Sequence, residues 1–482
     1  MVRHMSAPST APTFFWHDYE TFGAQPRRDR PAQFAGLRTD LDLEEIDAPV
    51  AWFCRPPRDQ LPDPEAVLIT GITPQRAEAE GLPEPEFAAR IEAELARAGT
   101  IGTGYNSMRF DDEVTRHLFW RNLIDPYARE YAQGCSRWDL LDVVRCTWAL
   151  RPEGISWPMG DDGRPSFRLT RLTAANGLAH DNAHDALSDV RATIALARLV
   201  RARQPRLWDF ALRLRHKDEV RRQIAAGRPI LHMSGHYPVE RGCMAVVWVL
   251  GPHPVNRNEV IVWDLDQDPE ILTRLDAGTL RRRLFTATSD LPDGETRLPL
   301  KTIHINRAPI VIGNLKVLGD AGGRFGIDLA RAQRHAGIAA RLPDLSALWA
   351  DVYARPPATA AIDVDEDLYG GFIGDADRRR LARLRALPPE DLATAVAFDD
   401  PRLDELLFRF RARNFAHTLS EVERARWTRH RRARLHDGVG GATTRAQFQA
   451  RIDTLVAAAA ERDDTRARGL LEALMEWART LD

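Results

Sequence analysis

The chain of 482 residues has few lysines, few cysteines and no long apolar run. Only three of its 67 basic residues are lysines, at Lys217, Lys301 and Lys316, so arginine carries almost all of the positive charge. A GC-rich coding sequence explains this skew most simply, although arginine also suits bidentate contacts to phosphate. The 67 basic and 69 acidic residues nearly cancel, which argues against a polyanion-binding protein without excluding one.

The scarcity of cysteine and of apolar runs excludes two further classes of protein. The four cysteines, Cys54, Cys135, Cys146 and Cys243, form no C-x-x-C pair, so we expect neither a disulfide framework nor a zinc site. Free, mostly buried thiols fit a cytoplasmic protein. No stretch reaches the 18 or more apolar residues of a membrane span, and the polar residues 1–12 indicate a disordered leader rather than a secretory signal.

Charge is unevenly distributed along the chain. Residues 1–100 carry an excess of acidic side chains, whereas residues 201–228 and 402–434 are rich in arginine. A basic run of this kind is most often a solvated helix face. It can equally belong to a phosphate-binding surface, and composition does not separate the two interpretations.

Pattern changes divide the chain into three parts after the leader. Strand-like runs alternate with helical spacing over residues 13–203, which predicts a layered α/β domain. Gln204-Pro205-Arg206 marks the first boundary, and short β runs between Gly, Pro and Asn predict a small β-rich domain over 204–355. After Arg355-Pro356-Pro357, helical spacing dominates residues 358–482.

Specific segments carry these expectations. In the first part we expect strands at 14–17, 33–42, 48–54 and 100–105, and helices at 84–98, 111–123, 136–150 and 184–203. In the second part we expect strands at 243–250, 259–265, 298–306 and 309–312. In the third part we expect helices at 375–386, 404–415, 419–435, 444–462 and 464–481.

The most informative segment, His17-Asp18-Tyr19-Glu20-Thr21, ends the first expected strand. The two-residue period of a strand places Asp18 and Glu20 on one face. Two adjacent carboxylates repel each other unless a cation lies between them, and hard oxygen ligands favour magnesium or manganese. A single D-x-E pair is weak support, because many surface turns contain one.

Two later segments strengthen this interpretation. Asp111 follows an expected strand and opens a helix, so its carboxylate can point back toward the sheet edge. If the segment from His184 is helical, His184 and Asp189 lie a little over one turn apart and can face one pocket. Each residue alone is explained by helix capping. Four acids and one histidine in this order and context are harder to explain in that way.

The three acidic segments resemble the exonuclease motifs of the DEDDh nucleases. The resemblance to the bacterial exodeoxyribonuclease I family extends over nearly the whole chain from about residue 13, and it is weakest at about 315–360 and after 435. The matching segments are His17-Asp18-Tyr19-Glu20-Thr21-Phe22-Gly23, Asp29-Arg30-Pro31-Ala32-Gln33-Phe34, Leu68-Ile69-Thr70-Gly71-Ile72-Thr73-Pro74, Ser136-Arg137-Trp138-Asp139-Leu140-Leu141-Asp142-Val143, Leu150-Arg151-Pro152-Glu153-Gly154 and Leu406-Leu407-Phe408-Arg409-Phe410-Arg411-Ala412-Arg413-Asn414-Phe415.

The resemblance implies an α/β fold: a ribonuclease H-like mixed-sheet exonuclease domain, an SH3-like β-rich domain and an all-helical C-terminal domain. It implies processive 3′→5′ hydrolysis of single-stranded DNA to 5′-mononucleotides, in DNA repair and recombination. The three domains would enclose a groove that the strand cannot easily leave.

The resemblance also assigns roles to the acidic residues and the histidine. Two magnesium ions, or manganese in their place, would be held by Asp18, Glu20, Asp111 and Asp189. A metal pair clamps the attacking and leaving oxygens of an in-line displacement. His184 would take the proton of the attacking water, because a neutral imidazole is a suitable base near pH 7. Asp112 and Asp185 would be turned away by helical geometry.

Residues that would contact DNA follow from the same family match. Glu20 and Thr21 would contact the terminal nucleotide, Phe167 would stack on a base and Arg168 would hold a phosphate. The strand's path would also include Arg116, Tyr127, Tyr131 and Arg145. Aromatic residues interleaved with cations suit a sequence-tolerant single-strand groove. The alternative is that Tyr127 and Tyr131 belong to the core and that the arginines are ordinary surface residues.

The family further implies a partner and leaves alternatives. Its members bind the acidic C-terminal tail of single-stranded DNA-binding protein, for which Arg151 is a candidate contact, and we expect a monomer. A proofreading or RNA-trimming DEDDh nuclease is one alternative, although such chains often end after one domain. A catalytically silent DNA-binding module is another, although a binding groove would not require the complete set of acids and His184.

Overall fold

A computed structural model of the chain describes residues 11–180, 184–225, 227–354, 362–394 and 397–481. The chain forms two compact units. Unit 1 comprises Met1–Ser136, His180–Arg191 and Ala360–Asp482, and unit 2 comprises Arg137–Ala179 and Ala192–Thr359. Apart from residues 11 and 12, the expected leader lies outside the described residues.

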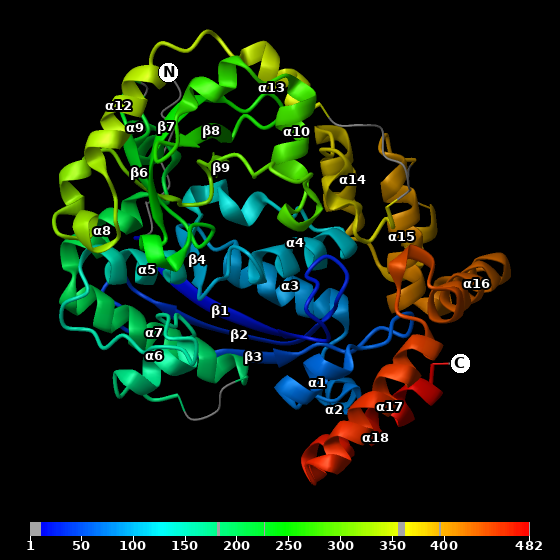
Figure 1. Cartoon of the computed structure of the whole chain (residues 1–482). Coiled ribbons are helices and arrows are strands. Elements are labelled where there is room, and N and C mark those ends of the chain that lie inside the picture. Colours follow the sequence, from blue (N-terminus) through cyan, green and yellow to red (C-terminus); the bar gives the residue numbers. More distant parts are fainter. Residues whose placement is uncertain (1–10, 181–183, 226, 355–361, 395–396, 482) are drawn as a thin grey trace, which may run out of the picture. The chain divides into compact units, whose positions relative to one another are not determined.

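Four strands of unit 1 lie side by side in the order β3-β2-β1-β4 (Figure 1). They span Thr13–Thr21 (β1), Pro31–Thr39 (β2), Val50–Phe53 (β3) and Thr100–Gly104 (β4). β1 is antiparallel to β2 and parallel to β4, so the sheet is mixed, as the resemblance implied. Aromatic residues, Phe14, Phe15, Trp16 and Tyr19, supply the apolar side chains of β1, and all four are buried.

Two amphipathic helices cover one face of this sheet. They are α3 (Glu84–Leu95) and α4 (Asp111–Arg121), close to the expected bounds. Phe15, Tyr19 and Phe34 from the strands pack with Phe87 of α3 and Leu118 of α4. Fully burying such side chains contributes roughly 1.5–3 kcal/mol each. This packing fixes the start of α4 beside the end of β1.

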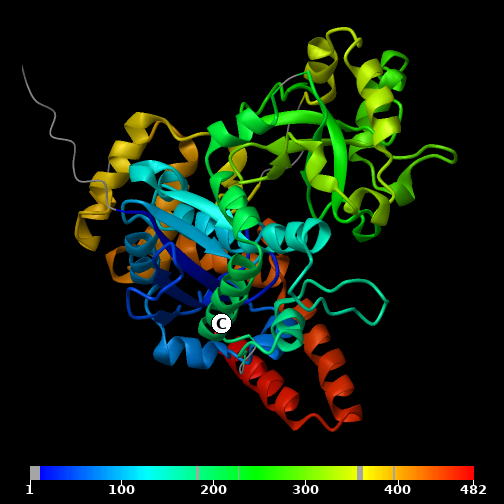
Figure 2. The same ribbon diagram turned by 90° about the vertical axis from the view of Figure 1, so that its left-hand side faces the viewer.

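The C-terminal helices of unit 1 pack against two parts of the sheet domain, the short helices after β3 and the end of α4. Two short helices after β3, α1 (Pro64–Thr70) and α2 (Pro74–Glu80), share a core with the last helices, which includes Val67, Leu471 and Trp477. Figures 1 and 2 show the last two helices side by side. The C-terminal helices are α14 (Asp375–Leu384), α15 (Pro401–Asn414), α16 (Glu421–Asp437), α17 (Arg445–Glu461) and α18 (Thr465–Arg479).

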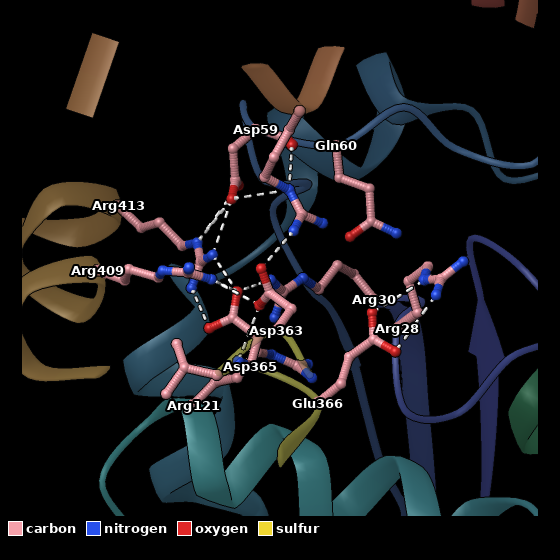
Figure 3. Close-up of polar contacts among 12 residues, drawn as sticks. Arg28, Arg30, Asp59, Gln60, Arg121, Asp363, Asp365, Glu366, Arg409 and Arg413 are labelled. Carbon is pink, nitrogen blue, oxygen red and sulfur yellow. Dashed lines mark hydrogen bonds and ion pairs between the residues drawn. The ribbon is translucent and has the colours of Figure 1, made fainter. Parts of the chain in front are cut away.

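A buried ion-pair network joins these helices to the first hundred residues (Figure 3). The Arg413 guanidinium lies 2.8 Å from an Asp59 carboxylate oxygen and also donates to Asp365 at 3.0 Å. Asp365 accepts from Arg409 at 3.3 Å and from Arg30 at 3.4 Å. Burial alone would raise the pKa of Asp365, but Arg413 and Arg30 hold it well below its usual range. We name Arg30, Asp59, Asp365, Arg409 and Arg413 the interdomain network.

Several arginines of the run 402–434 form ion pairs that stabilise the fold. The net positive charge of the run alone did not indicate this. Arg411 pairs with Glu423 at 2.6 Å, and Arg434 pairs with Asp363 at 3.2 Å. Arg402 pairs with Asp400 at 2.7 Å, and Arg426 pairs with Glu405. Much of the positive charge in this run is compensated by acids within unit 1.

Unit 2 contains a second, antiparallel sheet with the strand order β10-β6-β7-β8-β9. Four of these strands match the expected runs, with shifted ends: β7 (Met244–Pro252), β8 (Glu259–Asp264), β9 (Leu300–His304) and β10 (Ile310–Ile312). The fifth, β6 (Ile230–Met233), was not predicted, because four residues are too few for a clear period. Helices α8 (Pro205–Arg213), α9 (Lys217–Gln223), α10 (Ala277–Phe285), α11 (Ala321–Arg324), α12 (Leu329–Ala339) and α13 (Ser346–Val352) accompany the sheet.

Two expected helices begin later than their patterns indicated. Residues 136–150 form β5 (Ser136–Asp139) followed by α5 (Leu140–Leu150), so the single helix expected there is wrong. The Asp139 carboxylate accepts from Leu141 N–H at 2.9 Å and caps α5, which ends the strand. The helix expected from His184 is α7 (Ala186–Arg203), which leaves His184 in the preceding turn. A short helix, α6 (Leu169–Ala175), lies between α5 and α7 in sequence.

The cysteines agree with the expectation from the sequence. All four are free and buried. Among the described residues, no helix is both long enough and apolar enough to cross a membrane.

Candidate active site

The end of β1 carries the first two acids. Asp18 and Glu20 lie two residues apart on this strand, and Glu20 faces Gln33 of β2 in the antiparallel register. The register shifts between Glu20 and Thr21, so regular pairing stops next to the carboxylates. Bulges of this kind are frequent beside active sites, where they redirect a side chain.

Asp111 joins this edge from α4. Its Oδ1 accepts the backbone N–H of Tyr19 at 3.0 Å, which places the carboxylate between the positions of Asp18 and Glu20 along β1. Asp111 is the first residue of α4 and is only 3% exposed. The expectation that it points back toward the strand end is therefore confirmed.

His184 and Asp189 complete the cluster. Ligand atoms of Glu20, His184 and Asp189 all lie within 4.8 Å of one another. His184 is exposed in the turn before α7 and has a φ of 69°, a left-handed conformation that costs energy for a residue with a side chain. The turn, rather than the helical spacing proposed from the sequence, brings the imidazole to Asp189.

Each carboxylate of the cluster makes the ionised form of its neighbours less stable. Burial, together with Asp189 and Asp111, raises the pKa of Glu20 to about 8. Burial and the charges of Asp111 and Glu20 raise the pKa of Asp18 well above its usual range. A divalent cation relieves such repulsion, and carboxylate oxygens are the ligands that magnesium and manganese prefer. The residues present therefore fit a divalent metal site.

The neighbouring acids have other partners. Asp112 accepts from Arg129 at 2.6 Å in the interior of unit 1. Asp185 accepts from Gln33 at 3.2 Å and from the backbone N–H of Ser188 at 3.2 Å. The contacts of Asp112 and Asp185 agree with both residues lying outside the ligand set.

Thr21, predicted to contact the substrate, is 7% exposed and donates its hydroxyl to the Gly23 carbonyl at 2.6 Å.

Two side chains beside the cluster were missed by the sequence interpretation. His180 Nε2 lies 2.5 Å from Asp189 Oδ1, and the His180 side chain is 5% exposed. Gln33, on β2, contacts the beginning of α7. For His180, the available signal was a second histidine within nine residues of Asp189. For Gln33, only the family match at Asp29–Phe34 pointed to its segment.

The predicted DNA contacts of unit 1 lie around α4 and the following loop. Arg116 is 4% exposed and pairs with Glu130 at 2.8 Å and with Glu113 at 2.7 Å. Its guanidinium lies 5.4 Å from the centre of the Tyr127 ring. Tyr131 is 64% exposed. Tyr131 is therefore accessible for stacking, whereas Arg116 is held by two acids.

The predicted DNA contacts of unit 2 form a separate group. The Arg145 guanidinium lies 5.9 Å from the centre of the Phe167 ring and pairs with Asp142 at 2.7 Å. Phe167 packs edge-on against Trp148, with 5.3 Å between ring centres. Arg168 is exposed directly before α6. The Phe167 ring thus lies beside the Arg145 guanidinium, an aromatic–cation pairing that is common in single-strand grooves.

Arg151, the predicted partner contact, lines a largely apolar pocket of unit 2. Its guanidinium donates to the backbone carbonyls of Leu150 and Val317, the latter at 3.2 Å. The pocket is lined by Cys146, Leu150, Arg151, Gln204, Pro205, Arg206, Leu207, Phe210, Gln223, Ile312, Asn314 and Val317. Two arginines on an apolar pocket suit a peptide with both apolar and anionic groups.

Comparisons with known proteins agree with this layout. Three family models match successive parts of the chain: Exonuclease at residues 15–197, Exonuclease I SH3-like domain at 215–355 and Exonuclease I C-terminal domain at 362–481. These matches confirm the expected fold class, in which an exonuclease domain precedes an SH3-like and a helical C-terminal domain.

Related proteins and structures cover most of the chain. Exodeoxyribonuclease I of Escherichia coli K12 is 47% identical over 87% of this chain and 89% of its own length. Exonuclease I of Methylocaldum szegediense has a TM-score of 0.91 at 49% identity, covering 98% of this chain and 99% of the other.

Two further structures carry bound molecules or partners. E. coli Exonuclease I in complex with a dA16 oligonucleotide has a TM-score of 0.91 at 44% identity, covering 98% and 100% of the two chains. An SSB/Exonuclease I structure in complex with an inhibitor has a TM-score of 0.89 at 42% identity, with the same coverage. Together with the three family models, these likenesses show that the chain belongs to the exodeoxyribonuclease I family of nucleases.

Proposed function

We propose that the protein is a processive 3′→5′ exonuclease that hydrolyses single-stranded DNA to 5′-mononucleotides with two divalent metal ions. The observation that carries this proposal is the clustering of Asp18, Glu20, Asp111 and Asp189 with His184 at the end of β1. The oligonucleotide complex of the E. coli relative supports single-stranded DNA as the substrate class.

Each group of the cluster has a separate task in this reaction. The four carboxylates would hold magnesium, or manganese in its place. When bound, the metal pair supplies charge that stabilises the attacking and leaving oxygens. His184 accepts a proton from the attacking water on an imidazole nitrogen. Its exposed position leaves room for water. Asp18 and Glu20 would be poorly available as bases while they hold the metal.

A comparison of substrates tests this proposal. With magnesium, the protein should shorten a single DNA strand and spare a blunt duplex and an RNA strand of the same sequence. Preference for RNA would instead indicate an RNA-trimming nuclease. Binding of the single strand without any product would indicate a silent binding module.

Stacking and phosphate contacts would guide the strand toward the cluster. We propose that Glu20 and Thr21 contact the terminal nucleotide, and that Phe167 and Tyr131 stack on bases. Rings of this kind contribute about 1–3 kcal/mol per stacked base. Arg168 and Arg145 would hold phosphates, and Arg116 would position the Tyr127 ring and the neighbouring strand path.

Arg168→Ala should weaken single-strand binding and make it less sensitive to salt. One lost phosphate contact should lower the slope of log affinity against log salt by about 0.7 for a single strand. Fluorescence anisotropy at several salt concentrations measures this slope. Arg171→Ala is the matched control, because Arg171, on the helix that Arg168 directly precedes, pairs with Asp161 at 3.1 Å. An unchanged slope for Arg168→Ala would exclude the phosphate contact.

We also propose that the Arg151 pocket binds the acidic C-terminal tail of single-stranded DNA-binding protein. The SSB/Exonuclease I structure of a relative supports this partner. The carbonyls of Leu150 and Val317 hold the Arg151 guanidinium at the pocket, where it can pair with a carboxylate. We further propose that the protein acts in DNA repair and recombination, that it is cytoplasmic and that it is a monomer.

Arg151→Ala should weaken binding of a tail peptide by about 10- to 100-fold, because hydrogen bonds to charged groups contribute about 1.5–3 kcal/mol. Anisotropy of a labelled peptide measures the loss. Arg164→Ala is the control, since Arg164 is exposed and pairs with Glu240 at 2.8 Å. Equal affinity of the wild type and Arg151→Ala would place the tail elsewhere.

A further inference from the structure

Gln33 is a buried polar residue next to the acidic cluster that the proposed chemistry does not use. It is 5% exposed and lies on β2 directly opposite Glu20. Its Nε2 donates to Asp185 Oδ1 at 3.2 Å, and its Oε1 accepts the backbone N–H of Ala186 at 3.4 Å. Gln33 thus contacts the two residues that follow His184.

These two contacts fix the amino-terminal end of α7. The backbone N–H groups of a first helical turn have no partner within the helix, and Gln33 accepts one of them. Asp185 receives the Gln33 amide on Oδ1 and caps the helix through Oδ2, which accepts Ser188 N–H at 3.2 Å. The sheet that carries Asp18 and Glu20 is therefore tied to the turn that carries His184.

His184 needs such support because its backbone is strained. Its φ of 69° is unfavourable for a residue with a side chain and persists only where surrounding contacts impose it. Release of the turn would let His184 return to an ordinary conformation. The imidazole would then move away from Glu20 and Asp189, whose ligand atoms lie within 4.8 Å of it.

We propose that Gln33 is a positioning residue that holds His184 in its strained conformation, aimed at the metal cluster. The inference rests on the proposed function, because it takes His184 as the base. The described contacts of the Gln33 side chain are to Asp185 and Ala186, not to the proposed metal ligands. Gln33 acts through Asp185 and Ala186, so its loss should affect the chemical step far more than DNA binding.

Gln33→Leu removes both hydrogen bonds at nearly constant volume. We expect kcat on single-stranded DNA to fall about 10- to 100-fold, the effect of displacing a catalytic group by about 1 Å. KM and the magnesium concentration for half-maximal rate should stay within about twofold, because an interaction made only in the transition state changes kcat.

Gln60→Leu is the matched control. Gln60 is also buried, at 9% exposure, and donates to a carboxylate, Asp29, at 3.2 Å. It should lose a comparable amount of thermal stability while keeping kcat. Equal kcat losses in Gln33→Leu and Gln60→Leu would reduce the role of Gln33 to general stability and overturn the proposal.

A charge swap between positions 33 and 185 distinguishes a positioning role of Gln33 from a packing role. This test remains available even if Gln33→Leu fails to fold. Gln33→Glu places two carboxylates against each other and should lower kcat as Gln33→Leu does. In the double variant Q33E/D185N, the amide introduced at position 185 can donate to the carboxylate introduced at position 33. The amide oxygen still caps α7, since asparagine and aspartate are equally good caps. The double variant should regain most of the lost kcat.

The outcome of the swap decides the proposal. Recovery of kcat in the double variant supports it, and a kcat as low as that of Gln33→Glu contradicts it. Failure of the proposed function looks different. In that case the wild type itself would lack magnesium-dependent hydrolysis, whereas failure of this inference leaves wild-type activity intact and Gln33→Leu equally active.

Discussion

Asp18→Ala should lower the rate of single-stranded DNA hydrolysis by about 10³-fold or more. Asp18 lies beside Asp111, Glu20 and Asp189, whose charges help to raise its pKa. Removing it takes away a ligand that the metal pair requires. Metal stabilisation of the transition state amounts to several kcal/mol, and each 1.4 kcal/mol is a factor of about ten in rate. Quantified release of a 3′ label measures the effect.

Binding should survive this substitution, because the predicted strand contacts lie mostly outside β1. Anisotropy in the presence of a chelator compares the variant with the wild type. Asp42→Ala is the control, since Asp42 is an exposed acid in the turn after β2. Full hydrolysis by Asp18→Ala would show that the metal assignment is wrong.

Asp365→Ala should destabilise unit 1 by about 3–5 kcal/mol, the usual effect of removing one partner of a buried ion pair. Asp365 is 4% exposed and accepts from Arg413, Arg409 and Arg30. Without it, the interdomain network keeps three buried guanidinium groups and loses one of the carboxylates that hold them (Figure 3). Denaturant unfolding followed by tryptophan fluorescence measures the change.

An exposed ion pair provides the control for this prediction. Asp375 pairs with Arg378 at 3.2 Å, and its side chain is 81% exposed. Asp375→Ala should change the free energy of unfolding by about 0.5 kcal/mol or less. If Asp365→Ala changed the free energy of unfolding as little as Asp375→Ala, the interdomain network would not hold the C-terminal helices onto the sheet domain.

The sequence predicted the parts of the site that depend on local pattern. Alternation along a strand placed Asp18 and Glu20 together, and a strand followed by a helix start placed Asp111. Motif order then identified the family. The end of β1 could be predicted because each acid lies at the end of an element whose hydrophobic period is clear.

The features that the sequence did not predict depend on contacts between residues that are far apart along the chain. Asp59 and Arg413 are 354 residues apart in sequence, so nothing local indicated that the basic run 402–434 is internally paired. The turn at His184 depends on Gln33, which lies 152 residues before Asp185. A left-handed histidine opposes local preference, which is why the pattern predicted a helix from His184.

The central claim is that the acidic cluster hydrolyses single-stranded DNA from its 3′ end with divalent metal. The most direct measurement follows a strand labelled at either end during incubation with magnesium. A 3′ label should leave at once as a 5′-mononucleotide. A 5′ label should pass from the full-length strand to a short end product with few intermediates, and a chelator should stop both. Release of the 5′ label first, or equal turnover with the chelator, would contradict the account.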